Sequence, residues 1–249
     1  MKKKIFIGVF IVSLVLNMGL VIYVGWDYYK NHRNRDIFRL NAYAWANSQL
    51  KAPEFDENRV VFIGNSITEN WVHLRYKFFT DNNYVNRGIG GQTTPLLLLR
   101  FRHDVINLKP QVVVINGGVN DIAENTGEYD MEFTLDNIKS MAQLAEANDI
   151  KVILSSVLPS SGYGWKGHIK GVPQLIDTLN DSIKAFAIEN GYYYLDYNTP
   201  MRDEEGGIIA DYSFDQLHPN EEGYKVMEPL VQKAINEVLA RKEQTENNE

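Results

Sequence analysis

The chain has 249 residues, of which 44% are hydrophobic and 23% are charged, a composition that suits a globular protein with one sizeable core. Its formal net charge of −7 argues against a nucleic-acid partner, because such a partner needs a basic face. The sequence contains no cysteine, which excludes disulfide bonds, a thiol nucleophile, a cysteine-ligated metal site and the lipidated cysteine of a lipoprotein.

The N-terminal segment has the composition of a membrane span. Lysines at positions 2–4 precede residues 5–26, an apolar run of 22 residues with two clearly polar side chains. As a helix this run would be about 33 Å long at ~1.5 Å per residue, enough to cross a bilayer. It ends in an aromatic cluster over residues 23–29, which is typical of a membrane interface. We therefore predict a short basic tail over residues 1–4 and a transmembrane anchor over residues 5–26.

Two other interpretations of this segment are open. A cleavable signal peptide would have a shorter apolar core and a small-x-small cleavage site, so an uncleaved anchor is favoured. A buried core helix is disfavoured, because 22 residues without a charge are too uniformly apolar. Basic residues lie on both sides of the span, so the positive-inside rule does not orient it. The very short N-terminal tail favours a cytoplasmic N-terminus, with the following domain outside the cytoplasm, on the cell-envelope or periplasmic side.

The rest of the chain alternates between predicted strands and helices. Residues 27–57 are predicted to be a stalk, helical over 27–50, and a linker, and residues 242–249 a polar tail. Between them, residues 58–241 form one domain of repeated βαβ units, with a parallel sheet of about five strands covered on both faces. The expected strands are 60–63, 84–87, 111–115, 152–154 and 192–195, and the expected helices are 71–79, 95–106, 133–148, 174–190 and 220–241.

Polar or glycine-rich blocks follow the first three predicted strands, and a fourth block precedes the last helix. In sheets of this kind, ligands bind beyond the carboxyl ends of the strands, so these blocks are the candidates for a functional site. The blocks are Gly64-Asn65-Ser66, Gly88-Ile-Gly-Gly91, Gly117-Gly118-Val-Asn120-Asp121 and Asp215-Gln-Leu-His218-Pro219.

The fourth block supplies the partners that a serine nucleophile needs. A hydroxyl is a weak nucleophile until a neighbouring base takes its proton. Of the five histidines, only His218 has a carboxylate three residues before it in a loop that leads into a helix. Asp215 could hold one nitrogen of this ring while the other nitrogen faces Ser66, which is the arrangement of a catalytic triad.

The four blocks occur in the order found in the SGNH hydrolases, also called GDSL esterases and lipases, and residues 58–240 resemble this family. The resemblance implies a three-layer α/β fold of flavodoxin-like type and hydrolysis of an ester without a metal or organic cofactor. It implies that Ser66 is the nucleophile, that His218 is the base and then the acid, and that Asp215 orients the ring of His218.

The resemblance also implies an oxyanion hole. Its donors would be the N–H of Ser66, the N–H of Gly91 and the side-chain amide of Asn120. Such donors must already point at the place where negative charge develops on the former carbonyl oxygen. One position departs from the family pattern, because Asn65 stands where the family has an aspartate. Asparagine is nearly isosteric with aspartate and can still bond the neighbouring backbone, so this change bears on electrostatic tuning more than on the triad.

Several candidate residues also have a purely structural interpretation, and His218, before Pro219, could be a surface residue at the start of the last helix. Ser66 could cap the helix after the first strand, with Thr68 as a competing cap. The glycines of the second block could form only a turn, and they lack the spacing of a dinucleotide fingerprint. Asn120 could bond the backbone of its own turn, and Asp121 is expected to do so.

Other polar and aromatic residues carry weaker signals. In the long glycine-rich loop over residues 160–171, Tyr163 and Trp165 could line the mouth of the site. The remaining histidines lack the spacing of metal ligands and are interpreted as surface or partly buried residues: His32, His73, His103 and His168.

The expected function is hydrolysis of a carboxylic ester through an acyl-enzyme. The stretch Gly88-Ile-Gly-Gly-Gln-Thr-Thr94 resembles the acetylhydrolase-like branch of the family, which favours a short acyl group, such as that of an O-acetylated carbohydrate. A lysophospholipase or thioesterase activity is an alternative within the family. An alternative of another class is a catalytically silent envelope protein that binds a ligand at the same edge of the sheet. The expected partners are a small-molecule or carbohydrate ester and, through the N-terminal helix, a membrane.

Overall fold

The chain divides into two compact units, Met1–Arg39 and Leu40–Glu249. The structure, a computed structural model, describes residues 2–33, 38–53 and 58–246. The last part of the predicted linker and the end of the predicted C-terminal tail lie outside these residues.

The first unit contains α1 (Lys2–Arg33), one continuous helix of 32 residues. Its stretch Ile5–Tyr28 has a mean hydropathy of 2.7 in its most apolar window, and none of that window is buried. A core helix of a soluble protein would be mostly buried, whereas this window is not buried by its own unit. The helix is long and apolar enough to cross a membrane, as an anchor or as a signal sequence.

The second unit is built around a parallel sheet whose strands lie in the order β2-β1-β3-β4-β5. The two central strands β1 and β3 are buried at every position, because helices cover both faces of the sheet. Their sequences are accordingly continuous apolar runs rather than alternating ones. The strands are β1 (Val60–Gly64), β2 (Val85–Gly88), β3 (Val112–Asn116), β4 (Lys151–Ser155) and β5 (Tyr193–Leu195).

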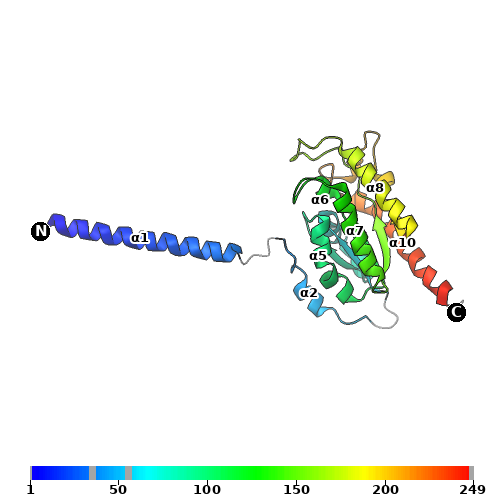
Figure 1. The fold of residues 1–249 in the computed structure, drawn as a ribbon, viewed down its shortest axis with the longest axis horizontal. Coiled ribbons are helices and arrows are strands. Elements are labelled where there is room, and N and C mark those ends of the chain that lie inside the picture. Colours follow the sequence, from blue (N-terminus) through cyan, green and yellow to red (C-terminus); the bar gives the residue numbers. More distant parts are fainter. Residues whose placement is uncertain (1, 34–37, 54–57, 247–249) are drawn as a thin grey trace. The chain divides into compact units, whose positions relative to one another are not determined.

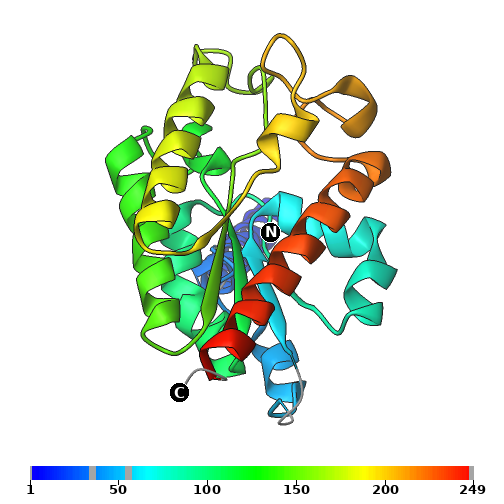
Figure 2. The same cartoon turned by 90° about the vertical axis from the view of Figure 1, so that its right-hand side faces the viewer.

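Helices form a layer on each face of this sheet, which confirms the predicted three-layer α/β fold (Figures 1 and 2). One layer contains α5 (Thr94–Asp104), α7 (Met131–Glu146) and α8 (Val172–Glu189), and the other contains α3 (Ser66–Leu74), α4 (Tyr76–Asp81) and α10 (Glu221–Glu246). The short elements are α2 (Ala44–Gln49), η1 (Ile106–Leu108), α6 (Val119–Ile122), α9 (Asn198–Met201) and η2 (Ala210–Tyr212).

Helix α7 shows how the sequence pattern produces this layering. Asp130 caps the helix, because its side chain accepts a hydrogen bond from the N–H of Phe133 at 2.9 Å. The buried apolar residues recur every three or four positions, so they form one face that packs on the sheet. They are Leu135, Ile138, Met141, Ala142 and Ala145.

Two predicted helices have different bounds in the structure. The helix predicted over 71–79 is two helices, because Arg75 leaves the helical conformation (φ −130°, ψ 47°) between α3 and α4. Its guanidinium forms two hydrogen bonds with Glu228 of α10, at 2.8 and 2.9 Å. Helix α10 continues to Glu246, so the predicted tail over 242–249 is helical for most of its length.

The boundary of the second unit also differs from the prediction. The sequence predicts a stalk and linker, separate from the domain, as far as residue 57, yet the compact unit begins at Leu40. Helix α2 packs beside α5 (Figure 1). The Tyr43 hydroxyl donates to the Gly88 carbonyl at 2.5 Å, and the Asn47 amide donates to the Asp104 carboxylate at 2.7 Å. These long-range contacts are invisible in the local composition, which is why the sequence assigned this segment to a stalk.

The docking of α2 predicts different outcomes for two truncations. Deleting residues 1–39 should give a soluble folded domain, because the apolar helix is removed and every contact of α2 is kept. Deleting residues 1–50 should lower the melting temperature further, because it removes the partners of Gly88 and Asp104. Each lost hydrogen bond is worth about 1 kcal/mol, and 1 kcal/mol shifts the melting temperature by roughly 2–4 °C in a domain of this size. Thermal unfolding followed by circular dichroism measures the difference. Equal melting temperatures would show that α2 contributes nothing to the domain.

Candidate active site

Ser66 lies at the carboxyl edge of the sheet, at the start of α3. Strand β1 ends at Gly64, and Asn65 is the N-cap of α3, its side-chain oxygen accepting from the Ile67 N–H at 3.0 Å. The cap is therefore Asn65, and neither Ser66 nor Thr68 performs that task. The Ser66 hydroxyl instead lies 2.9 Å from Nε2 of His218, a residue 152 positions later in the chain.

His218 is held by a short loop that closes on itself. Residues Ser213 and Pro219 form an antiparallel bridge, and the Ser213 hydroxyl donates to the His218 carbonyl at 3.0 Å. One Asp215 oxygen accepts the backbone N–H groups of Leu217 and His218, at 3.1 and 2.7 Å. The other oxygen lies 2.7 Å from Nδ1 of the His218 ring.

This arrangement fixes both the ring and its tautomer. A carboxylate can only accept, so Nδ1 carries the proton and Nε2 is left as an acceptor for the Ser66 hydroxyl. Burial raises the pKa of the Asp215 carboxyl, but the hydrogen bonds from the backbone and ring of His218 outweigh it and leave this pKa below its ordinary value. Asp215 is therefore ionised at neutral pH. The stabilisation that its carboxylate gives is complete above the ordinary Asp pKa of about 4, and is lost as the pH falls through the lowered value.

In the loop over residues 88–92, one backbone N–H makes no hydrogen bond to a described residue. Gly91 is exposed and has a φ of +78°, a conformation that glycine adopts without strain. Within the described part of the chain, its N–H has no acceptor. The other four N–H groups of the loop each have an acceptor. Gly88 donates to Asn86 Oδ1 at 2.9 Å and Ile89 to the Gly64 carbonyl at 3.0 Å. Gly90 donates to Glu69 Oε2 at 2.7 Å and Gln92 to the Ile89 carbonyl at 3.4 Å.

Asn120 faces this loop. Its side chain is buried, and Nδ2 donates to the carbonyl of Gln92 at 2.9 Å, so it bonds the neighbouring loop and not its own turn. An amide NH₂ group has two hydrogens, which leaves one for a further acceptor. Ser66 is the first residue of α3, and the first N–H groups of a helix have no acceptor within it.

The Asp121 carboxylate bonds its own backbone N–H, as expected, and it also bonds the start of α5, which the sequence does not predict. Its carboxylate accepts from both the N–H of Thr94, at 3.0 Å, and the hydroxyl of Thr94, at 2.6 Å. It thus satisfies the N-terminus of α5, directly after the glycine loop. Burial raises the pKa of Asp121, and the hydrogen bonds from Thr94 oppose that rise.

The long loop over 160–171 is attached to the segment that carries Asn120. Tyr163 is buried and its hydroxyl donates to the Val119 carbonyl at 3.2 Å. Trp165 lies beside Tyr163, with ring centroids 5.7 Å apart, and is 56% exposed. His168 contacts the Glu124 carboxylate at 2.8 Å, so it has a carboxylate partner that the sequence did not indicate.

Several polar residues that support the site were not identified from the sequence. Glu69 binds the glycine loop, and the buried guanidinium of Arg100 donates to the Gly64 carbonyl at 3.0 Å and to the Gln92 side chain at 2.6 Å. Arg100 and Asp104 form an ion pair of 3.0 Å whose side chains are both 0% exposed. Their spacing on α5 is that of any surface pair, so no local signal marks them as buried.

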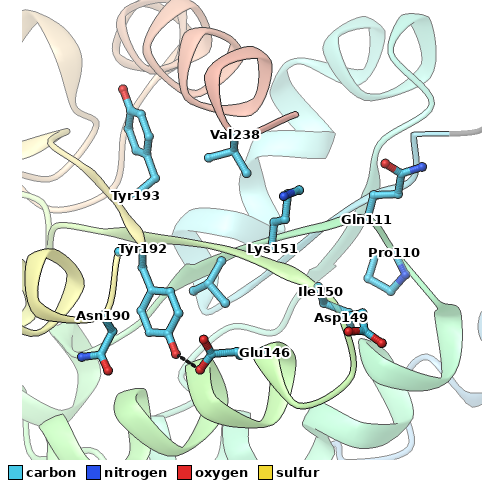
Figure 3. Close-up of a pocket in the computed structure, with 12 residues that line it drawn as sticks. Pro110, Gln111, Glu146, Asp149, Ile150, Lys151, Asn190, Tyr192, Tyr193 and Val238 are labelled. Carbon is cyan, nitrogen blue, oxygen red and sulfur yellow. Dashed lines mark hydrogen bonds between the residues drawn. The ribbon is translucent and has the colours of Figure 1, made fainter. Parts of the chain in front are cut away.

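A separate hollow lies at the opposite edge of the sheet (Figure 3). It is bordered by Gln111, Lys151 and Tyr193, which stand at the amino ends of β3, β4 and β5, and it includes no residue of the four motif blocks. Tyr192 donates to Glu146 there at 2.6 Å. The residues with the chemistry of a site lie at the carboxyl edge, where sheets of this kind bind ligands. Among the described residues, no three or more His, Asp or Glu side chains are grouped so as to hold a metal ion.

Comparison with known proteins identifies the class. The profile of the GDSL-like lipase/acylhydrolase family matches residues 62–226, and the chain belongs to this family. A solved protein of Bacteroides fragilis, assigned to the acylhydrolases, is 49% identical, with a TM-score of 0.81 over 83% of this chain and 100% of that chain. A GDSL-like lipase from Bacteroides thetaiotaomicron is also 49% identical, with a TM-score of 0.79 over 80% of this chain and 98% of that chain. The protein is thus a hydrolase that acts on ester bonds.

More distant relatives have named activities. An acetylxylan esterase of Xylanibacter ruminicola is 26% identical over 77% of this chain, and the match spans 45% of the length of that esterase. The platelet-activating factor acetylhydrolase IB subunit alpha2 of Homo sapiens is 28% identical over 70% of this chain and 75% of the subunit.

Proposed function

We propose that this protein is a serine esterase that hydrolyses a carboxylic ester through an acyl-enzyme. The observation that carries the proposal is the continuous relay from the Ser66 hydroxyl to His218, at 2.9 Å, and from His218 to the Asp215 carboxylate, at 2.7 Å. A nucleophile bonded to a base, which is itself oriented by a carboxylate, has the geometry of an activated serine.

In the first half of the reaction, Nε2 of His218 takes the proton of the Ser66 hydroxyl as Oγ attacks the ester carbonyl carbon. Asp215 stabilises the imidazolium that forms. The tetrahedral intermediate collapses when His218 gives the proton to the leaving alcohol. A water molecule then repeats the sequence on the acyl-enzyme: His218 takes its proton, the hydroxide attacks, and Ser66 regains its proton as the carboxylic acid leaves.

We propose that three donors stabilise the charge on the tetrahedral intermediate. These are the N–H of Ser66, the N–H of Gly91 and the second amide hydrogen of Asn120. Their support is that none of the three hydrogens has an acceptor among the described residues, while the neighbouring N–H groups do. Donors that are already in place stabilise developing charge without reorganisation.

For the substrate, we propose a short acyl group on a carbohydrate hydroxyl, such as an O-acetylated polysaccharide. An acetylxylan esterase and platelet-activating factor acetylhydrolase subunits are both among the relatives, and both names denote acetyl esters. The similarity to the acetylhydrolase subunits also makes an acetylated lipid the second candidate. The two candidates share the acyl group and differ in the alcohol.

We further propose that α1 anchors the enzyme in a membrane, with the catalytic domain outside the cytoplasm, at the cell envelope. The support is the length and apolar character of residues 5–28. Another relative, 30% identical over 41% of this chain, is a Bacillus subtilis lipoprotein.

Substitution of the relay tests the mechanism. Ser66→Ala and His218→Ala should each lower kcat by several orders of magnitude, and the double variant should be little worse than either, because the members act as a unit. Initial rates with p-nitrophenyl acetate measure these effects. A fluorophosphonate probe should label the wild type and leave Ser66→Ala unlabelled. Near-additive losses would refute the relay, and an unlabelled wild type without turnover would favour the silent binding protein.

Two adjacent residues separate stabilisation of the intermediate from stabilisation of the fold. Asn120→Ala should lower kcat by about 10²–10³-fold with KM nearly unchanged, because the lost bond strengthens only as charge develops. Asp121→Ala should instead lower the melting temperature, because it removes the acceptor for Thr94, while kcat per folded molecule stays within a few-fold of the wild type. Kinetics and thermal unfolding on the same preparations measure both quantities. The opposite assignment of the two effects would exclude Asn120 from the oxyanion hole.

The acyl preference can be tested with p-nitrophenyl esters from acetate to palmitate. We expect kcat/KM to be highest for acetate and to fall with chain length, and we expect acetate release from acetylated xylan. A maximum at long chains would instead indicate a lipase or lysophospholipase. Acetate release from an acetylated ether phospholipid but not from xylan would select the second candidate. Ser66→Ala, tested on each substrate, controls for spontaneous hydrolysis.

A further inference from the structure

The loop over residues 88–92, which contains Gly91, depends on its surroundings for its shape. Three of its five residues are glycines, which have little conformational preference of their own. A donor in a catalytic site must be held within roughly 0.5 Å of its productive position. The side chains that hold this loop are therefore as relevant to the rate as the donor itself.

Two of the holding side chains come from helices next to the motif blocks. Glu69 on α3 accepts the Gly90 N–H at 2.7 Å, and Arg100 on α5 donates to the Gln92 side chain at 2.6 Å. At the start of the loop, Gly88 lies directly against α3, since a Cβ on Gly88 would be 2.1 Å from the Glu69 nitrogen. These contacts fix the loop from the side of the sheet.

A further set of contacts comes from the segment around α2, outside all four motif blocks. The Tyr43 hydroxyl donates to the Gly88 carbonyl at 2.5 Å, at the first peptide of the loop. Asn47 accepts from Nε of Arg87, the residue before Gly88, at 2.8 Å. Asn47 also donates to Asp104 at 2.7 Å. Asp104 in turn pairs with Arg100, so this segment is connected to both ends of the loop.

Arg87 is a buried cation that depends on the contacts with Tyr43 and Asn47. Its side chain is 6% exposed, and its guanidinium carbon lies 4.7 Å from the centre of the Tyr43 ring. Burial lowers the pKa of Arg87, as expected of a cation removed from water, while the charge of Asp104 opposes that shift. Tyr43 and Asn47 thus cover a buried cation that is adjacent in sequence to the glycine loop.

We propose that Tyr43 and Asn47 are positioning residues for the oxyanion loop, so that the segment following the apolar helix contributes to catalysis as well as to tethering. Neither residue touches the substrate. They act through Gly88, Arg87 and Asp104 on the placement of the Gly91 N–H. The inference rests on the proposed role of Gly91 in the oxyanion hole.

The test uses full-length protein in detergent. Tyr43→Phe removes one hydroxyl and keeps the ring over Arg87, and Asn47→Ala removes the link to Arg87 and Asp104. Trp45→Ala is the matched control, because Trp45 lies with Asn47 on α2, directly after its N-cap Tyr43, and is 77% exposed. We expect Tyr43→Phe to lower kcat by about 3- to 10-fold, the worth of one hydrogen bond, and Asn47→Ala to lower it by at least as much, because it removes two. In both variants KM should stay within about twofold of the wild type.

Two further readouts separate positioning from stability. The inhibition constant of a boronic acid that forms a tetrahedral adduct with Ser66 should rise by the same factor as kcat falls, because the adduct oxygen occupies the oxyanion hole. The midpoint of the pH–rate profile should not move, because the Ser66–His218–Asp215 relay is untouched. Trp45→Ala should match the wild type in every measurement. Unchanged kcat per folded molecule and an unchanged inhibition constant in Tyr43→Phe would overturn the inference, whatever the melting temperature.

Failure of the proposed function would look different. An inactive wild type, or an active Ser66→Ala variant, would refute the serine esterase mechanism. In that case, hydrogen exchange would still test whether the segment around α2 holds the loop over residues 88–92. Exchange measured by mass spectrometry on the peptide that covers residues 88–92 should be faster in Tyr43→Phe than in Trp45→Ala. Equal exchange in the two variants would overturn the positioning role without reference to turnover.

Discussion

The in-register pairing of β1 with β2 and β3 is the constraint on which the site depends. Gly64 pairs with Gly88 on one side and with Asn116 on the other, so three strands end at one level. The loops that follow begin together, which brings Ser66, Gly91 and Asn120 to the same edge although 54 positions separate the first from the last. Because β1 and β3 are buried on both faces, a slip of one residue would exchange every side chain between the two faces. Core packing thus fixes the geometry of the site.

The sequence predicts the parts of the fold that depend on local pattern. Strand β3 and helix α7 lie within two residues of their expected bounds, because continuous apolar runs and a 3.6-residue period are strong signals. The break at Arg75 was missed, since arginine is a good helix former and its partner Glu228 is 153 positions away. The docking of α2 was missed for the same reason.

In the candidate site, too, the residues with a local sequence motif could be predicted, and the residues that act through distant partners could not. The motif order was enough to select Ser66, Gly91, Asn120, Asp215 and His218, and the structure brings them to one edge. The residues that hold the loops, Glu69 and Arg100 among them, have no distinctive spacing and were found only through their distances. Asn65 is an intermediate case: the predicted bond to neighbouring backbone is present, as the cap of α3.

The buried ion pair of Arg100 and Asp104 holds the loop over residues 88–92 at a cost in desolvation free energy. Two charges taken out of water carry a desolvation penalty that their mutual attraction offsets only with good geometry and further hydrogen bonds. Arg100 meets this condition through the Gly64 carbonyl and the Gln92 side chain, and Asp104 through Asn47. Well-packed apolar residues can often replace a buried ion pair without loss of stability, but here they would remove the partners of a loop rich in glycine. We interpret the buried pair as the rigid floor of the site.

The loop over residues 213–219 has a consequence for how such sequences diverge. Asp215 uses one oxygen to build the turn and the other to orient the ring, and within the described part of the chain the partners of both oxygens lie in the same loop. The histidine therefore carries its own support, whatever the length or composition of the chain that precedes it. Insertions and deletions in the segments between Ser66 and this loop can reshape the surroundings of Ser66 while the imidazole keeps its orientation. Over evolutionary time, the choice of ester can thus change independently of the machinery that cleaves it.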